Sequence, residues 1–175
     1  MMVLDILKYP DKRLRERSQP VKPEEISSVA FQKLLDDMFA TMYAAPGVGL
    51  AAVQVGVLQR FMVLDVGIPE GELIKRDPKV LINPEFVSKE GEVVWEEGCL
   101  SCPDLTVPVK RAQRVVVKGL DREGRPYELS GEDLLAVALQ HEVDHMDGIL
   151  ILDKLSRLKQ DLYKDKVKKG QVVVR

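Results

Sequence analysis

The sequence is poor in the two side chains that bind transition metals most strongly. Its 175 residues include only two histidines, His141 and His145, and two cysteines, Cys99 and Cys102. Two cysteines cannot build a disulfide framework, and a chain of this length does not need one. A reducing, cytoplasmic compartment is therefore the simplest interpretation. Any site built from these residue types must use nearly all of them.

Long apolar runs are also lacking. No stretch reaches the roughly 18 consecutive apolar residues of a membrane-spanning helix, so we expect no membrane contact. Residues 1–10 lack the basic start and apolar run of a secretory leader. The formal net charge is only −2, so bulk charge does not favour a nucleic-acid partner. A content of 45% hydrophobic residues excludes wholesale disorder, and the length predicts one domain over residues 1–175.

The pattern of apolar and turn residues predicts an α+β fold. Apolar residues at helical spacing indicate one helix from Pro23 to about Tyr43. A second helix is expected up to about Met146, with Ser130 as its N-cap. The other expected elements include an extended loop over 11–22 and a loop over 67–78. Short strands are expected between residues 61 and 129, among them 80–83, 86–87 and 106–109. A short strand or extended core segment over 149–152 and a last helix over 155–169 would follow. Antiparallel or mixed strands would surround the second helix, with helices near both termini.

Both histidines fall in one motif on that second helix. Residues 141–145 are His-Glu-Val-Asp-His, so the two imidazoles share one helical face and can reach one metal ion. Glu142 can then take a proton from a water molecule that the metal has acidified. The alternative is a pair of solvated histidines on a charged helix.

A hydrolytic metal needs a third protein ligand. Ile151 stands where a metzincin protease would place a histidine, and Asp165 lies in a lysine-rich helix. Cys99 is the better candidate, because a thiolate binds divalent iron, cobalt, nickel or zinc strongly. Cys99 and Cys102 with both histidines also fit a closed structural zinc site without catalysis. We prefer a buried, apolar role for Cys102.

A glycine-rich segment forms the third cluster, over residues 47–56. Glycines allow the backbone to approach a strand or a substrate closely, and tight core packing is the alternative. The spacing is not that of a dinucleotide-binding fingerprint. Gln54 is an amide in an apolar stretch, so it either bonds to backbone or faces a ligand.

Together the three clusters resemble those of peptide deformylase. That family carries Gly-x-Gly-x-Ala-Ala-x-Gln, Glu-Gly-Cys-x-Ser and His-Glu-x-x-His. All three motifs stand here complete and in order, at residues 47–54, 97–101 and 141–145. The segments between and around them fit as well, so the resemblance covers most of the chain.

The resemblance implies one divalent metal ion, Fe²⁺ in many members, with Zn²⁺, Ni²⁺ or Co²⁺ possible in the purified protein. Its ligands would be Cys99, His141 and His145. Glu142 would act as general base and then acid, while the Gln54 amide and the Leu100 backbone N–H stabilise the oxyanion. The implied reaction is hydrolysis of the N-formyl group of the formyl-methionine on nascent chains. Metal-bound water attacks the formyl carbon, and formate is released.

The methionine side chain of such a substrate needs an apolar pocket. Residues one and two turns before His141 project on the metal's side of the helix, and residues beside the other two motifs complete the set. We predict a pocket lined by Val48, Trp95, Leu134, Val137 and Ala138, with backbone at Gly49 and Gly98 pairing to the peptide as an added strand. Plain core packing is the alternative for each side chain.

Two positions depart from the family pattern. Trp95 replaces a smaller aliphatic residue, and Thr106 stands where some relatives carry an arginine that touches the peptide. We therefore expect a different pocket shape and different binding beyond methionine. Glu97, also counted among the residues around the substrate, would orient a ligand or neutralise an arginine such as Arg111. A solvated carboxylate is the alternative.

The net charge of −2 is unevenly distributed. Residues 154–175 hold eight basic and two acidic side chains, a net charge of +6, which leaves −8 for the rest of the chain. The resemblance is to bacterial members whose C-terminal helix engages the ribosome, and a basic helix suits ribosomal RNA. A solvated helix face is the alternative.

Two other functions fit part of the pattern. One is an endopeptidase that uses the same His-Glu-x-x-His chemistry, and activity on formyl-Met peptides against internal peptide bonds separates it from a deformylase. The other is a non-enzymatic module with the closed zinc site. Metal retention and full turnover after Cys102→Ala would exclude that site.

Overall fold

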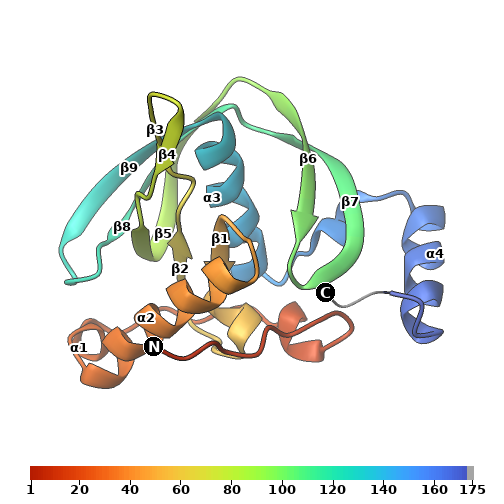
Figure 1. The fold of residues 1–175 in the computed structure, drawn as a ribbon, viewed down its shortest axis with the longest axis horizontal. Coiled ribbons are helices and arrows are strands. Elements are labelled where there is room, and N and C mark those ends of the chain that lie inside the picture. Colours follow the sequence, from red (N-terminus) through yellow and green to blue (C-terminus); the bar gives the residue numbers. More distant parts are fainter. Residues whose placement is uncertain (173–175) are drawn as a thin grey trace.

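A computed structural model describes residues 1–172, and residues 173–175, which include Arg175 of the basic segment, lie outside the described part. Residues 1–172 contain four α-helices, three 3₁₀ helices and nine strands (Figure 1). All strand pairs in the sheets are antiparallel, so the α+β prediction is confirmed. No helix in this part of the chain is both long and apolar enough to cross a membrane.

A five-stranded sheet forms the body of the molecule. Its strands, in spatial order, are β1 (Gly49–Ala51), β2 (Phe61–Leu64), β5 (Lys79–Glu90), β8 (Arg114–Leu120) and β9 (Pro126–Glu132). The sequence predicted two separate strands over 80–83 and 86–87, whereas β5 is continuous. Two irregularities in the pairing of β5 with β8 disturb its alternation, which explains the split prediction. β1 is an edge strand, paired on one side with β2.

Two hairpins stand apart from this sheet. β3 (Ile68–Glu70) and β4 (Leu73–Lys75) form the first, so the predicted loop over 67–78 is wrong. Gly71, at φ +64°, supplies the turn between these exposed strands. β6 (Val93–Cys99) and β7 (Cys102–Arg111) form the second hairpin, joined by the two residues 100 and 101.

The predicted N-terminal helix is two helices. α1 (Pro23–Ile26) ends before Ser28, whose side chain accepts a hydrogen bond from the Phe31 N–H at 3.2 Å and caps α2 (Val29–Ala44). A serine that satisfies a free helical N–H starts a new helix, which the apolar spacing alone did not reveal. α2 packs against β1, β2 and β5 through one apolar face.

α3 (Asp133–Met146) carries residues 141–145, and the chain turns away after it at Gly148, whose φ is +74°. Ser130 is not its N-cap, because β9 continues through Ser130 to Glu132. Glu132 takes the N-cap position without a side-chain hydrogen bond. α3 buries Ala136, Leu139 and Met146 against the sheet. In Figure 1 it stands between that sheet and the β6–β7 hairpin.

A third core cluster joins the N-terminal segment, β7 and the C-terminal elements. No strand forms over 149–152. Leu150 is extended and buried in this core, and a 3₁₀ helix, η3 (Ile151–Lys154), follows it, because the Asp153 carboxylate accepts from the Leu150 N–H at 2.9 Å and favours a turn. The last helix, α4 (Arg157–Lys168), lies at the outer end of the molecule (Figure 1). The two other 3₁₀ helices are η1 (Lys12–Arg15), inside the expected extended loop, and η2 (Ala52–Val55).

Candidate active site

Three side chains from two elements converge at one point. Cys99 ends β6, and His141 and His145 lie one turn apart on α3. The Nε2 atom of His145 is 3.2 Å from both Cys99 Sγ and His141 Nε2, and one ligand atom from each residue lies within 4.8 Å of the others. The three side chains that the sequence predicted to lie close together are therefore close together. One sulfur and two imidazole nitrogens that face a common centre fit a transition-metal ion with an open coordination position.

Cys102 and Asp165 were the other ligands considered, and in the described part of the chain neither belongs to this group. Cys102 is 1% exposed and packs in the third core cluster with Leu14 and Val107, as expected of a small buried residue. Asp165 is an exposed residue of α4. Three converging ligands leave room for substrate, unlike a closed four-ligand site.

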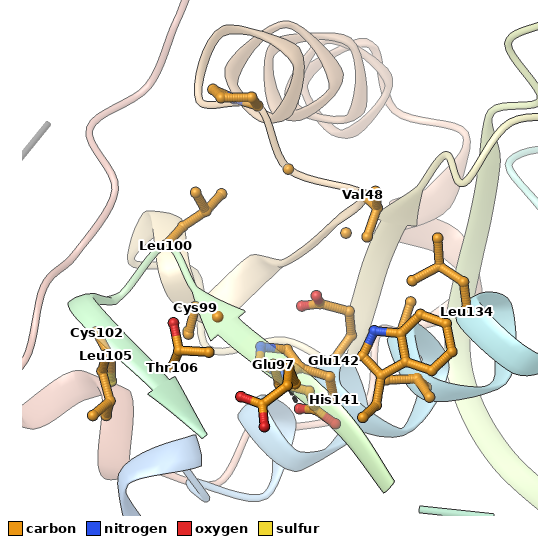
Figure 2. Close-up of a pocket in the computed structure, with 18 of the residues that line it drawn as sticks. Val48, Glu97, Cys99, Leu100, Cys102, Leu105, Thr106, Leu134, His141 and Glu142 are labelled. Carbon is orange, nitrogen blue, oxygen red and sulfur yellow. Dashed lines mark hydrogen bonds and ion pairs between the residues drawn. The ribbon is translucent and has the colours of Figure 1, made fainter. Parts of the chain in front are cut away.

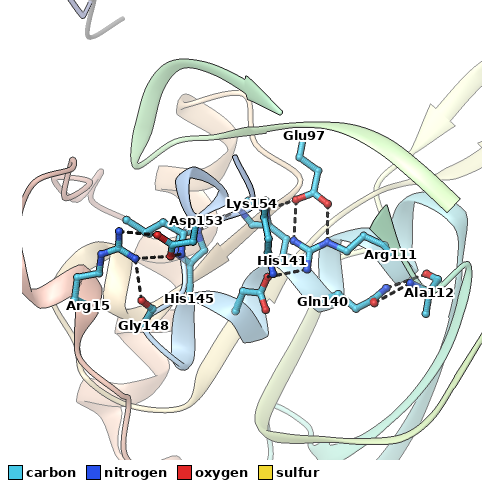
Figure 3. A network of polar contacts seen from close by, with 12 residues as sticks. Arg15, Glu97, Arg111, Ala112, Gln140, His141, His145, Gly148, Asp153 and Lys154 are labelled. Carbon is cyan, nitrogen blue, oxygen red and sulfur yellow. Dashed lines mark hydrogen bonds and ion pairs between the residues drawn. The ribbon is translucent and has the colours of Figure 1, made fainter. Parts of the chain in front are cut away.

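A network of buried charges holds His141 (Figure 3). The Nδ1 atom of His141 is 2.9 Å from Glu97 Oε2, and Arg111 donates to both Glu97 oxygens at 2.7 and 2.9 Å. A third Arg111 nitrogen donates to Asp144 at 2.7 Å. Because ionised Glu97 can only accept, His141 carries its proton on Nδ1 and leaves Nε2 free for a metal.

The Glu97–Arg111 contact expected from the sequence is present, and the solvated alternative is excluded because Glu97 is 5% exposed. Burial alone would raise the pKa of the Glu97 carboxyl. Hydrogen bonds from Arg111 and His141 overcome that effect and hold this pKa below its ordinary value. Asp144, which the sequence analysis did not single out, extends the network to Lys154 at 3.3 Å.

Glu142 lies beside the three converging atoms and is 4% exposed (Figure 2). Burial raises the pKa of its carboxyl, and its Oε2 atom has no hydrogen-bond partner among the described residues. A Cβ atom at Gly49 would lie 2.5 Å from Glu142 Oε1. The glycine at position 49 therefore makes the space that Glu142 occupies.

The Gln54 amide bonds to backbone and also faces the site. Its Oε1 accepts from the Ala51 N–H at 2.9 Å, and its Nε2 donates to Ser101 Oγ at 3.1 Å and lies 4.0 Å from Cys99 Sγ. Nε2 carries two hydrogens, one for Ser101 and one for the long contact with Cys99 Sγ, and the second points toward the three converging side chains. The sequence analysis gave Ser101 no role, although its place in the Glu-Gly-Cys-x-Ser motif was a usable signal.

The turn after Cys99 is fixed by the N-terminal segment. Lys8 Nζ donates to the Leu100 carbonyl at 2.6 Å, and the Tyr9 N–H donates to the Ser101 carbonyl at 2.8 Å. The Ser101 N–H in turn points at Cys99 Sγ, at 3.4 Å. Nothing in the sequence marked Lys8, because this contact joins residues 92 positions apart.

A cavity of about 460 Å³ opens next to these residues (Figure 2). Its lining includes every residue predicted to surround the substrate: Val48, Gly49, Trp95, Glu97, Gly98, Leu134, Val137 and Ala138. A Cβ atom at Gly98 would meet no atom within 4 Å, so the backbone there is open to the cavity. Thr106 also lines it, together with Asp104 and Leu105, which the sequence analysis missed because the start of β7 was placed at residue 106.

The basic residues near the C-terminus are separate from this cavity. Six of the seven that the structure describes are exposed, and Tyr163 is the one buried residue of α4. The Tyr163 hydroxyl donates to the Pro103 carbonyl at 2.9 Å and so attaches α4 to β7. α4 is thus attached through Tyr163, while most of its basic side chains, and also Leu158 and Leu162, are exposed.

Comparisons with known proteins agree with this geometry. A family model described as polypeptide deformylase matches residues 3–161. Peptide deformylase 2 of Xanthomonas campestris pv. campestris is 53% identical over 169 residues, which are 97% of this chain and 96% of that protein. The crystal structure of a peptide deformylase from Legionella pneumophila is 46% identical, with a TM-score of 0.86 over 97% of this chain and 95% of the other.

A third relative was crystallised with a peptide. The Met-Ala-Ser-bound peptide deformylase from Acinetobacter baumannii is 34% identical, with a TM-score of 0.81 over 88% of this chain and 99% of the other. The family match over residues 3–161 includes the segments that carry all three motifs.

Proposed function

The chain belongs to the peptide deformylase family of metallohydrolases, which remove the N-formyl group from nascent peptides, and we propose how its own residues carry out that reaction. In this proposal one catalytic domain holds a single divalent metal ion. The ligands are Cys99, His141 and His145. The observation that carries the proposal is the convergence of these three donor atoms beside a buried, partly unpartnered Glu142.

The donor set suits Fe²⁺ as the native metal, and Zn²⁺, Ni²⁺ or Co²⁺ can use the same ligands, because one thiolate and two imidazoles bind all of these ions. When bound, the metal supplies Lewis-acid activation of a water molecule and of the formyl carbonyl. The protein supplies the ligands, their orientation and the proton transfers. Arg111 and Asp144 keep Glu97 in place, and Glu97 keeps the Nε2 atom of His141 turned inward.

Glu142 is the proton carrier in this proposal. Its buried carboxyl has a raised pKa, which brings its proton affinity closer to that of the groups with which it exchanges protons. It first takes the proton of the attacking water molecule and then delivers it to the departing amine of methionine. Because Gly49 has no side chain, the carboxylate can move between these two positions without a steric barrier on that side.

Two donors stabilise the negative charge that develops on the formyl oxygen. One is the Gln54 N–H that does not bond to Ser101, and the other is the Leu100 backbone N–H. Other hydrogen bonds hold both residues in place. The Ala51 N–H donates to the Gln54 side-chain oxygen, and Lys8 Nζ donates to the Leu100 carbonyl. Donors that are fixed in advance need little reorganisation as the charge forms.

The cavity receives the methionine of the substrate. Its apolar side chains come from α3 and from β6, while β1 at the edge of the sheet and the backbone at Gly98 offer hydrogen bonds to an extended peptide. The Met-Ala-Ser peptide bound to the Acinetobacter baumannii relative has the sequence type that this arrangement would accept. Trp95 and Thr106 would then set the preferences beyond methionine.

We also propose that the protein works in the cytoplasm and that α4 docks on the ribosome. The support is the exposed basic face of α4, which would contact the phosphate groups of ribosomal RNA. Such contacts weaken as salt rises. The body of the chain, at −8, would remain free to face the emerging peptide.

The decisive experiment is anaerobic purification with metal analysis, combined with formate release from formyl-Met-Ala-Ser. We expect about one metal ion per chain and turnover that disappears on chelation. Acetyl-Met-Ala-Ser, the matched control, has a larger acyl group and should react far more slowly. Cleavage of internal peptide bonds with intact formyl groups would instead identify an endopeptidase.

A further inference from the structure

The proposed reaction uses Lys8 only as a residue that helps to hold the turn after Cys99, and gives no role to its positive charge. Lys8 lies in the N-terminal segment before η1, is half-buried, and donates from Nζ to the Leu100 carbonyl at 2.6 Å. That carbonyl belongs to the same peptide group as the Ser101 N–H. The Ser101 N–H points at Cys99 Sγ, at 3.4 Å. One peptide group therefore lies between an ammonium ion and the sulfur of a proposed metal ligand.

The surroundings hold this peptide group in a fixed orientation. The Ser101 carbonyl accepts from the Tyr9 N–H at 2.8 Å, and the Gln54 carbonyl accepts from the Leu7 N–H at 2.7 Å. Three consecutive residues, 7 to 9, thus bind both the Cys99 turn and the glycine-rich segment. These backbone hydrogen bonds hold the segment against the turn and so keep the Lys8 ammonium group within reach of the Leu100 carbonyl.

Charge can act through a peptide group that is held in this way. A cation at the carbonyl oxygen withdraws electron density and makes the N–H on the other side of the amide a stronger donor. A stronger donor to a thiolate draws density away from sulfur, and hydrogen bonds around a cysteine ligand are known to tune the metal that it binds.

Resting on the proposed metal site, we infer that Lys8 is a positioning residue that tunes the Cys99 thiolate through the Leu100–Ser101 peptide group. Its charge strengthens the hydrogen bond from the Ser101 N–H to sulfur, so less electron density passes from sulfur to the metal. The metal keeps more of its Lewis acidity as a result. Lys8 itself touches neither substrate nor metal.

The test uses the cobalt-loaded protein, because a thiolate bound to Co²⁺ gives a charge-transfer absorption band whose energy reports the electron density on sulfur. Lys8→Met removes the charge and keeps the chain length, whereas Lys8→Arg keeps the charge. Lys12→Met is the matched control at an exposed lysine of η1. We expect the band to move to longer wavelength in Lys8→Met and to stay near the wild-type position in the other two variants.

A second measurement addresses the hydrogen bond directly. In the zinc-loaded protein, the amide proton resonance of Ser101 should move upfield in Lys8→Met and not in Lys12→Met. If Lys8→Met does not fold, Lys8→Gln, which keeps a neutral donor, takes its place and should shift the band in the same direction.

An unshifted band in Lys8→Met would overturn the inference and leave the proposed metal site intact. An equal shift in Lys8→Met and Lys8→Arg would also overturn it, because packing rather than charge would then be responsible. A wild-type cobalt protein without any thiolate charge-transfer band would contradict Cys99 as a ligand, and both proposals would fall together.

Discussion

The charges around His141 and the charges of α4 obey different physical rules. The side chains of Arg111 and Glu97 are 6% and 4% exposed, and each makes at least two charged hydrogen bonds. The ion pair within α4, between Lys164 and Asp161, spans 3.8 Å with side chains 37% and 60% exposed. Water molecules can replace the ionic partners of the exposed charges on α4, whereas they can replace hardly any partner of the buried charges around His141.

The difference shows which charged side chains have positions that are fixed by their partners. A buried charge without a partner is expensive, so the positions of Arg111 and Glu97 are dictated by each other and by the ring they orient. An exposed lysine is stable in many conformations and constrains its partner little. The proposal for the cavity can therefore name individual residues, whereas the proposal for α4 names a class of partner.

The largest expected effect comes from Glu142. Replacing it by glutamine removes the proton carrier while keeping the shape, and turnover should fall by about 10² to 10⁴. Metal content should stay at the wild-type level, since no ligand is lost. Formate release and metal analysis on the same preparation measure both. Glu128→Gln, at an exposed position on β9, is the control, and near-wild-type turnover in Glu142→Gln would refute the assigned role.

A matched pair of arginines tests the comparison itself. Arg111→Met removes the two hydrogen bonds that buried Glu97 receives from the guanidinium group and leaves Asp144, which is 22% exposed, with Lys154 alone, and we expect a loss of about 3–5 kcal/mol in the free energy of unfolding. Arg114→Met breaks the exposed pair with Glu90, at 3.2 Å, and should cost at most about 1 kcal/mol. Urea unfolding of the two variants measures both losses in the free energy of unfolding. Similar losses would mean that burial does not separate the two kinds of charge.

A smaller effect is expected on the stability of the fold at low pH. Because the folded pKa of Glu97 is depressed, its ionised form stabilises the fold above its unfolded pKa, and this contribution is lost as pH falls through the folded value. Glu97→Gln lacks that contribution at every pH. The difference in urea midpoint between wild type and Glu97→Gln should therefore shrink below about pH 4. A difference that is constant from pH 7 to pH 3 would contradict this.

The smallest effect on catalysis is expected from α4. Changing Lys166, Lys168 and Lys169 to glutamate should leave formate release from a short peptide within about twofold, because surface changes far from a site act weakly. Co-sedimentation with ribosomes at low salt should decrease strongly, and its salt dependence should flatten. The same reversal at Lys12, Lys22 and Lys75 is the control. Equal loss of ribosome binding in both variants would remove α4 from the interaction.

The sequence predicted the parts of the site that are local or that belong to a spaced motif. His141 and His145 are one helical turn apart in any helix, so their common face follows from spacing alone. Cys99 was found because few alternatives existed in a chain with two cysteines. The lining of the cavity followed from the faces of α3 and from neighbours of the motifs.

The parts that were missed depend on distant segments or on single local hydrogen bonds. Asp144 and Lys8 gain their places from β7 and from the turn after Cys99, which no local pattern reveals. Ser28 divides the first helix through one hydrogen bond. The β3–β4 hairpin was mistaken for a loop because its exposed strands bury no apolar face.

The contact between Lys8 and Leu100 also has a consequence for the order in which the chain folds. It closes a loop of 92 positions, and both proposed histidine ligands follow later still in synthesis. Contacts of such long sequence separation form slowly, because loop closure costs chain entropy before any contact compensates for it. A growing chain that ends before residue 141 has one proposed ligand and no cavity. With the proposed ligands, metal binding would therefore have to wait until the chain has grown past residue 145.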